Sequence, residues 1–172
     1  MPTSKIYGLK TNLNPIKKEL SAVINSCVSN ALNFPKEKRL QRFFPMETED
    51  FYHGEGRSDK YTIIEIALFE GRSKETIKEL ITSLYSEIEK HFGISKVDVD
   101  ILIIELPKQN WGLQGALGDE QNLGYKVEIW IGNKTKLIIK KNILELLFVT
   151  GDSMTLEKFR TEFSGDFHNF IN

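Results

Sequence analysis

The sequence predicts an α/β (α+β) protein in which two tandem β-α-β units form a four-stranded mixed sheet with both helices on one face. A strand–helix–strand pattern occurs twice, with a period of about 60 residues. Pro2 lies twelve residues before a helix cap at Asn14, and Thr62 lies eleven residues before a cap at Ser73. This repeat indicates an internal duplication. Parallel β-α-β connections are right-handed, which places both helices on the same face.

The first unit is expected to contain a strand at Thr3–Leu9, then a helix, then a strand at Arg39–Phe44. Asn14 can cap the helix, and Pro15 suits its first position, where the missing N–H is harmless. Pro35 ends the helix. One apolar stripe recurs at helical spacing along it: Ile16, Leu20, Val23, Ile24, Cys27, Ala31 and Leu32.

The second unit follows a polar segment, Glu47–Asp59, which is expected to be a loop. Tyr61–Phe69 is apolar at nearly every position and therefore predicts a central strand. Ser73 caps the next helix, Gly93 ends it, and Val97–Leu106 is the last strand of the sheet. The core stripe of this helix comprises Ile77, Leu80, Ile81, Leu84, Tyr85, Ile88 and Phe92.

The final third of the chain has a weaker pattern. Residues 107–123 are rich in glycine and predict a loop, and Gly124–Trp130 predicts a strand. Lys136–Val149 is compatible with a strand or a helix, and Thr155–Phe163 is typical of a helix.

These elements divide the chain into a domain, residues 1–130, and an extension of unknown role, residues 131–172. Within the domain, residues 2–59 form the first β-α-β half. Residues 60–130 form the second half with its loop and strand. Because the central strand is apolar on both sides, the sheet face opposite the helices also needs a cover, and oligomerisation is the expected one.

Composition and charge exclude several classes of protein. The 172 residues include 23 basic and 24 acidic side chains, for a net charge of −1, which disfavours a nucleic-acid-binding protein. No apolar run is long enough for a membrane span and no leader is visible, so we expect a cytoplasmic protein without membrane partners. The single cysteine, Cys27, excludes an intramolecular disulfide and belongs to a helix stripe. Three scattered histidines are expected to be surface or packing residues: His53, His91 and His168.

Two features of the N-terminal half favour acid–base chemistry on a small anion. Four of the five arginines lie between Arg39 and Arg72, and guanidinium binds a carboxylate through two parallel hydrogen bonds. The same cluster is compatible with surface ion pairs. Removal of Met1 would expose the Pro2 nitrogen as a secondary amine. An α-amino group has a pKa of about 7.7–8.0, and burial or nearby cations lower it toward the range useful to a general base.

Residues 61–115 resemble oxalocrotonate tautomerase. The resemblance is carried by Glu70-Gly71-Arg72-Ser73, a turn after one strand, and by Asn110-Trp111-Gly112 after the next. Residues 2–130 as a whole resemble the fused, double-length members of the tautomerase superfamily. In those proteins two β-α-β units replace a dimer of short chains, and three chains form a trimer. The resemblance therefore implies a tautomerase (MIF-like) fold and a homotrimer.

The same resemblance implies roles for individual residues. Pro2 is the general base, and the second half has Thr62 at the aligned position, so each chain has one prolyl amine. Arg72, in the Gly-Arg-Ser turn, binds the substrate carboxylate. Trp111 matches the aromatic wall of the pocket, although a contact between subunits is also compatible with it.

The second arginine of the family is less easily placed. In the second half its position is occupied by Asp100, which departs from the family pattern. We take Arg42 as the corresponding residue of the first half, with Arg39 as the alternative. Arg57, in a Gly-Arg-Ser sequence that repeats the other turn, is a further candidate for binding substrate.

The implied reaction is keto–enol or 1,3-allylic tautomerisation of a small carboxylic acid, without a metal or cofactor. Pro2 takes a proton from an enol oxygen or an activated carbon and returns it at another carbon. Arg72 holds the carboxylate, and Arg42 stabilises charge on the developing enolate.

Three alternatives remain open from the sequence. Hydration of a haloacrylate needs a carboxylate to activate water, for which Asp50, Glu55 and Asp119 are candidates without a secure match. The decarboxylase branch of the superfamily uses an acidic residue soon after the first helix, where this chain has Lys38. A non-catalytic binding module is the third, because the Pro2 nitrogen is an amide if Met1 is retained.

Overall fold

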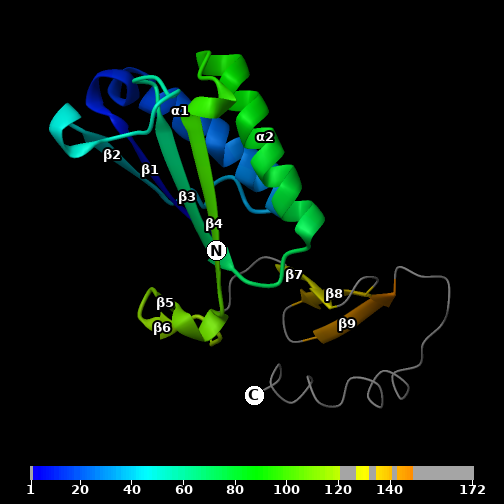
Figure 1. Cartoon of the computed structure of the whole chain (residues 1–172). Coiled ribbons are helices and arrows are strands. Elements are labelled where there is room, and N and C mark those ends of the chain that lie inside the picture. Colours follow the sequence, from blue (N-terminus) through cyan, green and yellow to red (C-terminus); the bar gives the residue numbers. More distant parts are fainter. Residues whose placement is uncertain (1, 121–126, 132–134, 141–142, 149–172) are drawn as a thin grey trace. The chain divides into compact units, whose positions relative to one another are not determined.

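The computed structural model describes residues 2–120, 127–131, 135–140 and 143–148. The chain divides into two compact units, residues 1–125 and 126–172. The first unit contains a four-stranded sheet in the order β2-β1-β3-β4 (Figure 1). Its strands are β1 (Thr3–Leu9), β2 (Gln41–Met46), β3 (Thr62–Phe69) and β4 (Val99–Leu106). β1 is parallel to β2 and antiparallel to β3, which is parallel to β4, so the predicted mixed sheet is confirmed.

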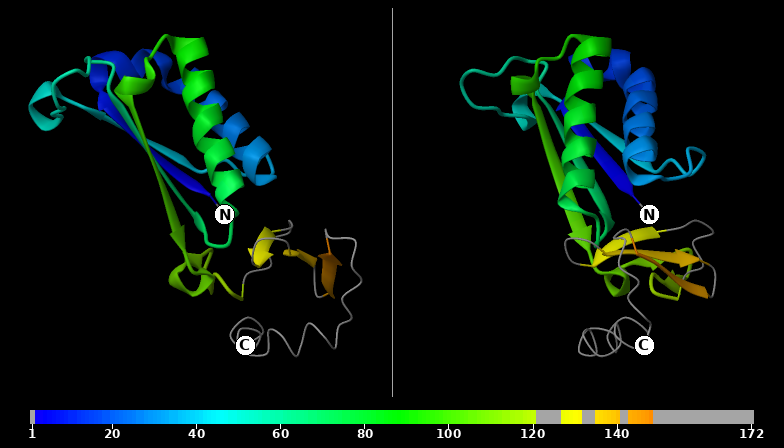
Figure 2. Two further views of the ribbon diagram at one scale, coloured as in Figure 1. Left: turned by 45° about the vertical axis from the view of Figure 1, so that its right-hand side comes forward. Right: turned by 90° about the vertical axis from the view of Figure 1, so that its right-hand side faces the viewer.

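Two helices, α1 (Lys10–Leu32) and α2 (Lys74–Phe92), lie side by side on one face of this sheet, as predicted (Figure 2). The core lies between the helices and the sheet. Its completely buried side chains come from both layers and include Ile6, Leu20, Ile24, Ile64, Ile66, Leu80, Leu84 and Ile88. Burial of this interface is the main favourable term that holds the two halves together.

The start of α1 differs from the prediction. The helix begins at Lys10 rather than after Asn14, so Pro15 lies inside it. Leu9 occupies the cap position and makes no side-chain hydrogen bond to the first turn. Pro15 has no N–H to donate to the carbonyl of Thr11 one turn earlier, which leaves the first turn short of one helical hydrogen bond.

The second strand also differs by two residues. β2 runs from Gln41 to Met46, whereas Arg39–Phe44 was predicted, and Pro45 pairs with Gly8 inside it. Because β2 is an edge strand with β1 as its neighbour, the missing proline N–H costs it no necessary hydrogen bond.

The second β-α-β half agrees more closely with the sequence. Ser73 caps α2, and its hydroxyl accepts a hydrogen bond from the backbone N–H of Thr76 at 3.1 Å. Gly93 ends the helix in the left-handed conformation, with φ of 58°. A short 3-10 turn, Lys96–Asp98, takes the first two positions that were predicted as strand.

The strand register preserves the internal duplication. Gln41 is 37 positions after its partner Ser4, and Val99 is 37 positions after its partner Thr62. Thr3 pairs with Ala67. The residue 60 positions after Thr3 is Ile63 and the residue 60 positions before Ala67 is Tyr7, and these two also form a pair. The sheet therefore has a pseudo-two-fold relation between residue i and residue i + 60.

The segment after β4 is more ordered than the predicted loop. A 3-10 turn, Lys108–Asn110, leads into a hairpin of β5 (Gly112–Leu113) and β6 (Ala116–Leu117). Its turn residues, Gln114 and Gly115, have φ of 52° and 85°, which is the pattern of a two-residue hairpin.

The second unit contains an antiparallel sheet of β7 (Val127–Ile131), β8 (Thr135–Lys140) and β9 (Ile143–Phe148). The segment Lys136–Val149, for which the sequence allowed a strand or a helix, thus forms most of β8 and all of β9. β7 belongs to this unit, so the observed division falls five positions before the expected boundary at residue 130. The helix predicted at Thr155–Phe163 lies outside the described residues.

The sheet face opposite the helices is open and largely apolar. Phe44, Leu102 and Ile104 are 39%, 45% and 37% exposed on it. Glu65 lies among them and is bound by Lys5 at 3.6 Å and by the Tyr7 hydroxyl at 3.2 Å. Among the described residues, no helix is long and apolar enough to cross a membrane.

Candidate active site

Pro2 lies in a small hollow at the end of the sheet where β1 and β2 begin. The ring is buried, and the walls come from β1, from α1 and from the segment that leads into β2. The backbone N–H of Ser4 donates to the carbonyl of Leu40 at 2.9 Å, which joins the two strand starts. The residues around Pro2 are Ser4, Asn25, Val28, Phe34, Lys38, Arg39, Leu40 and Gln41.

Arg72 belongs to the same end of the sheet. Because β3 runs antiparallel to β1, its last residues and the following turn lie next to the beginning of β1. Gly71 has φ of 102°, a conformation that favours glycine and lets the turn place Arg72 before the helix cap. The Arg72 guanidinium is half-buried and donates to the carbonyl of Leu32 at 3.5 Å, while the backbone N–H of Arg72 donates to Glu105 at 3.2 Å. Leu32 lies two positions before Phe34, which lines the Pro2 hollow.

The structure separates the two other arginines of this region. Arg39 is exposed and lines the Pro2 hollow, and it forms no ion pair with any described residue. Arg42 is exposed on the open face of β2, where it donates to the Thr3 hydroxyl at 3.1 Å. The register also corrects the correspondence assumed from the sequence: the counterpart of Asp100 is Leu40, two positions before Arg42 on the same face. Arg39 therefore lines the pocket of Pro2, whereas Arg42 is not part of the lining and is bonded to Thr3, the residue after Pro2.

Trp111 packs at the end of β3 in the first unit. Its ring meets Phe69 edge to face, with centroids 5.2 Å apart. Gly118 donates its N–H to the carbonyl of Trp111 at 2.8 Å, and a Cβ on Gly118 would lie 2.4 Å from the carbonyl oxygen of Lys108. Glycine is thus required for the hairpin to close beside Trp111.

Arg57 lies at the opposite end of the sheet from Pro2. It donates to Asp100 at 2.9 Å, and its guanidinium stacks 4.3 Å from the centroid of Tyr61. Tyr61 donates to the other oxygen of Asp100 at 2.6 Å. Hydrogen bonds from Tyr61 and then Arg57 lower the pKa of Asp100, and burial with the bond to Asp100 raises the pKa of Tyr61 to about 12. Within one chain, Arg57 therefore fastens the loop before β3 and does not share the hollow of Pro2.

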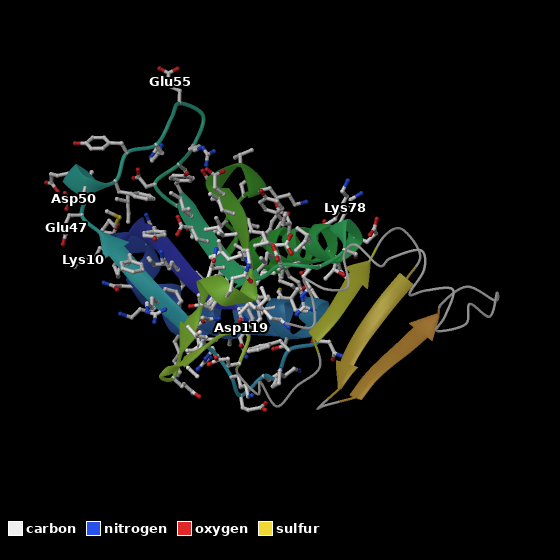
Figure 3. All side chains as sticks on the ribbon, turned by 90° about the horizontal axis from the view of Figure 1, so that it is seen from below. Lys10, Glu47, Asp50, Glu55, Lys78 and Asp119 are labelled. Carbon is white, nitrogen blue, oxygen red and sulfur yellow. The ribbon has the colours of Figure 1, made fainter. Side chains whose placement is uncertain are left out.

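The carboxylates considered for water activation are not gathered around Pro2. Asp50 and Glu55 lie in the loop after β2, at the same end as Arg57, and Figure 3 shows Glu55 pointing outward from the tip of that loop. Asp119 is exposed after the β5–β6 hairpin and interacts electrostatically with the half-buried Lys108. Among the described side chains, the lining of the Pro2 hollow contains no acidic residue.

The structure adds residues that sequence reasoning did not select. Lys38, considered only as a departure from the decarboxylases, lines the Pro2 hollow together with Asn25 and Gln41. Asn25 donates to the carbonyl of Lys36 at 3.0 Å, and Gln41 accepts a hydrogen bond from Ser21. Ser21 and Asn25 are polar residues four positions apart on α1, so they lie on the same side of the helix, and this spacing was a signal in the sequence for the polar lining.

The remaining candidates are structural. Cys27 is buried in the core, and burial raises the pKa of its thiol, which disfavours the nucleophilic thiolate. His53 lies edge to face with Tyr61, and His91 lies 3.2 Å from Glu87 on α2. His168 lies outside the described residues.

A buried proline beside Lys38 and Arg39 suits, once Met1 is removed, a reaction that moves a proton on an organic anion. Cations and burial favour the uncharged form of an amine, which is the form that accepts a proton. Guanidinium groups supply the charge-assisted hydrogen bonds that a carboxylate prefers.

Comparison with known proteins leads to the same group of enzymes. A family model described as "Tautomerase enzyme" matches residues 38–114. A probable tautomerase of Staphylococcus saprophyticus is 34% identical over 59 residues, which are 34% of this chain and 97% of that protein. A probable tautomerase of Staphylococcus haemolyticus is 36% identical over 54 residues, 31% of this chain and 87% of that protein. The chain belongs to the tautomerase family.

Solved structures share the fold at low sequence identity. Native fused 4-OT superposes with a TM-score of 0.63 at 18% identity, covering 72% of this chain and 99% of that one. Malonate semialdehyde decarboxylase gives 0.61 at 19% identity, covering 68% and 94%. Their agreement confirms the tautomerase fold predicted from the sequence.

Proposed function

We propose that this protein is a cofactor-independent tautomerase of a small enol or keto carboxylic acid, acting in the cytoplasm with Pro2 as general base. The observation that carries the proposal is the shared pocket of Pro2 and Arg39 at the sheet end to which the Arg72 turn also belongs. It requires removal of Met1, because only a free prolyl nitrogen can accept a proton.

Each group has a defined part in the proposed reaction. The Pro2 nitrogen accepts the proton of the enol hydroxyl, the oxygen forms the carbonyl, and the electron pair of the C=C bond takes the proton back at carbon. Arg72 and Arg39 hold the carboxylate, and Arg42, which is bonded to Thr3, balances charge on the enolate. Trp111 supplies an apolar wall.

We further propose that three chains assemble through the open face of the sheet. Exposed Phe44, Leu102 and Ile104 support this, because a monomer gains nothing from an uncovered apolar sheet face. Two related solved structures are described as trimers of fused 4-OT, one asymmetric and one symmetric. Assembly can also bring Arg57 or Trp111 of one chain toward the pocket of another.

The test is turnover of the enol of phenylpyruvate, followed by loss of its ultraviolet absorbance, beside release of halide from 3-chloroacrylate. Fast ketonisation without halide release supports a tautomerase. Halide release as the faster reaction favours the hydratase alternative. If protein shown by intact mass to lack Met1 catalyses neither reaction, the non-catalytic binding module is the alternative that remains.

A further inference from the structure

A second pocket lies at the end of the β1–β3 pair opposite Pro2, around Thr62. Its volume is about 230 Å³, which admits a ligand smaller than most drugs. The walls come from the β1–α1 junction, the segment entering β3, and the end of α2: Gly8, Leu9, Thr11, Asn12, Leu13, Pro15, Ile16, Lys60, Tyr61, Thr62, Phe92 and Ile94.

The pseudo-two-fold relation makes this pocket the counterpart of the Pro2 hollow. A shift of 60 positions takes Pro2 to Thr62 and Phe34 to Ile94, and both members of each pair line their respective pockets. The same shift relates Asn12 to Arg72. The duplicated architecture therefore holds a cavity at both ends of the sheet, with different chemistry in each.

In the Thr62 pocket, neutral side chains occupy the positions that correspond to Pro2 and Arg72. Thr62 is buried, and its hydroxyl donates to the carbonyl of Lys60 at 2.9 Å. Asn12 donates to the carbonyl of Asp59 at 2.7 Å. Both side chains are neutral at every physiological pH, so neither takes the place that the Pro2 amine has in the other pocket.

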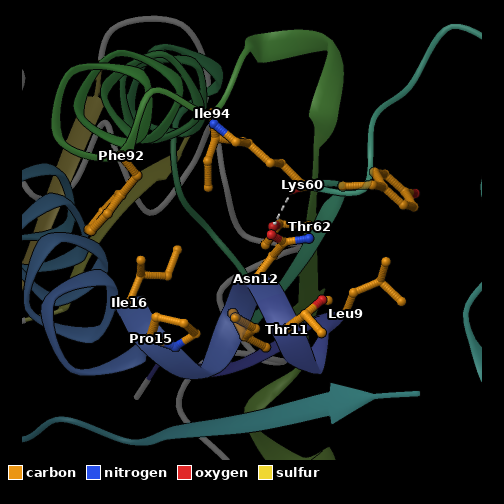
Figure 4. Close-up of a pocket in the computed structure, with 12 residues that line it drawn as sticks. Leu9, Thr11, Asn12, Pro15, Ile16, Lys60, Thr62, Phe92 and Ile94 are labelled. Atoms are coloured by element: carbon orange, nitrogen blue, oxygen red, sulfur yellow. Dashed lines mark hydrogen bonds between the residues drawn. The ribbon is translucent and has the colours of Figure 1, made fainter. Parts of the chain in front are cut away.

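Lys60 gives the pocket its charge preference. Figure 4 shows its side chain extending along one side toward Ile94, with Ile16 and Phe92 on the opposite side. The ammonium is 3.4 Å from the carbonyl of Gly93 and has no carboxylate partner among the described residues. In the part of the chain that the structure describes, no acidic side chain lines the pocket. Nearby Lys10 and Lys96 differ, because Glu47 and Glu89 pair with them.

We propose that the Thr62 pocket binds a small monocarboxylate with an apolar body, which Lys60 holds by its carboxylate and the Ile16–Phe92 wall holds by its hydrocarbon part. The ligand is bound without being converted, so each chain has one catalytic and one binding-only site. This site does not depend on Pro2 chemistry.

Phenylacetate is a suitable probe, with binding measured by NMR titration of the full-length protein. An Arg72→Ala background weakens the Pro2 site, so that the remaining binding reports on Thr62. In that background we expect saturable binding that Lys60→Gln weakens about tenfold or more, because a charge-assisted contact is lost. Lys60→Arg should retain it, and Lys78→Gln, which removes an exposed lysine of α2, is the matched control.

Two results would overturn this site: loss of all phenylacetate binding in Arg72→Ala alone, or equal affinity in Lys60→Gln and Lys78→Gln. Ile16→Trp provides a second check, since the indole ring is larger than the isoleucine side chain and should fill the cavity and prevent binding while Lys60 remains. Enol turnover is measured separately on the unmodified protein, so failure of the proposed enzyme activity and failure of this pocket are distinguishable.

Discussion

The two ends of the β1–β3 pair have the same strand register but different side chains in their pockets. At one end Pro2 lies beside Arg39, with the Arg72 turn at the same sheet end. At the other end the equivalent positions hold Thr62 and Asn12, and Arg57 is paired with Asp100. The duplicated fold thus has a pocket at both ends, with Pro2 and Arg39 at one end and Thr62 and Asn12 at the other.

This difference shows which features of the fold serve stability and which serve chemistry. The shared register and the buried stripes of α1 and α2 position both pockets. Under the two proposals made above, the side chains at a few pocket positions decide whether a site transfers a proton or only binds an anion. Variants at the two ends should therefore fail in different ways.

The largest effect is expected from Pro2→Ala. A flexible primary amine would replace a ring-fixed secondary amine, so kcat for phenylpyruvate enol should fall by about 10²–10⁴-fold, the usual contribution of general acid–base catalysis. Stopped-flow absorbance measures this loss, and circular dichroism checks that the variant is folded. Turnover within twofold of the unmodified protein would remove Pro2 from the mechanism.

Arg72→Ala should act on substrate binding. Charge-assisted hydrogen bonds are worth about 1.5–3 kcal/mol, so KM for a carboxylate substrate should rise by about 10–150-fold. Lys78→Ala is the comparison, because Lys78 is an exposed cation of α2 and should change KM by less than about threefold. An equal rise for an uncharged ester substrate would show that Arg72 does not bind the carboxylate.

Gly118→Ala should disturb the Trp111 region alone. A Cβ 2.4 Å from the Lys108 carbonyl forces the hairpin to shift, with a cost of about 1–3 kcal/mol as for other overpacked sites. We expect a lower Tm and altered tryptophan fluorescence, whereas Gly54→Ala, where nothing lies within 4 Å, is the control. The two variants having the same Tm would contradict the tight closure beside Trp111.

The smallest effect concerns pH and the Arg57–Asp100–Tyr61 cluster. The pKa of Asp100 is lowered in the folded protein, so its stabilising effect is present at neutral pH and is lost as the pH falls through that folded pKa. The pKa of Tyr61 is raised to about 12, so stability also declines as the pH rises from about 10 toward 12.

Urea unfolding of Asp100→Asn across this pH range provides the check. The variant should be less stable than the unmodified protein at pH 7, and the difference should shrink below about pH 4, the ordinary range of a carboxyl group. A difference that stays constant from pH 7 to pH 2 would mean that ionisation of Asp100 does not contribute.

The fold was predictable where local signals and tertiary packing agree. β1 and the Ser73 cap were located from sequence because alternation and capping chemistry are local. The start of α1 and the position of β2 were not, because Pro15 and Pro45 are tolerated only in the context of a long packed helix and an edge strand. The strands β8 and β9 were ambiguous for a different reason: a short apolar run has no period that distinguishes a strand from a helix.

The N-terminal proline and the Gly-Arg-Ser turn led from the sequence to Pro2 and Arg72, which lie at the same end of the sheet, and their roles stay predictions. The placement of Arg39 rather than Arg42 in the pocket was not, because strand register decides which side chain turns inward and a sequence does not fix register. The Thr62 pocket could not be predicted either, since its lining combines three segments far apart in the chain.

The most direct test of the central claim changes only the Pro2 nitrogen. Protein that begins at Pro2 should be compared with the same protein carrying one glycine before Pro2, with both masses verified. The amide cannot accept the proton, so ketonisation of phenylpyruvate enol should fall at least a hundredfold in the extended protein. Equal rates in the two proteins would contradict the account.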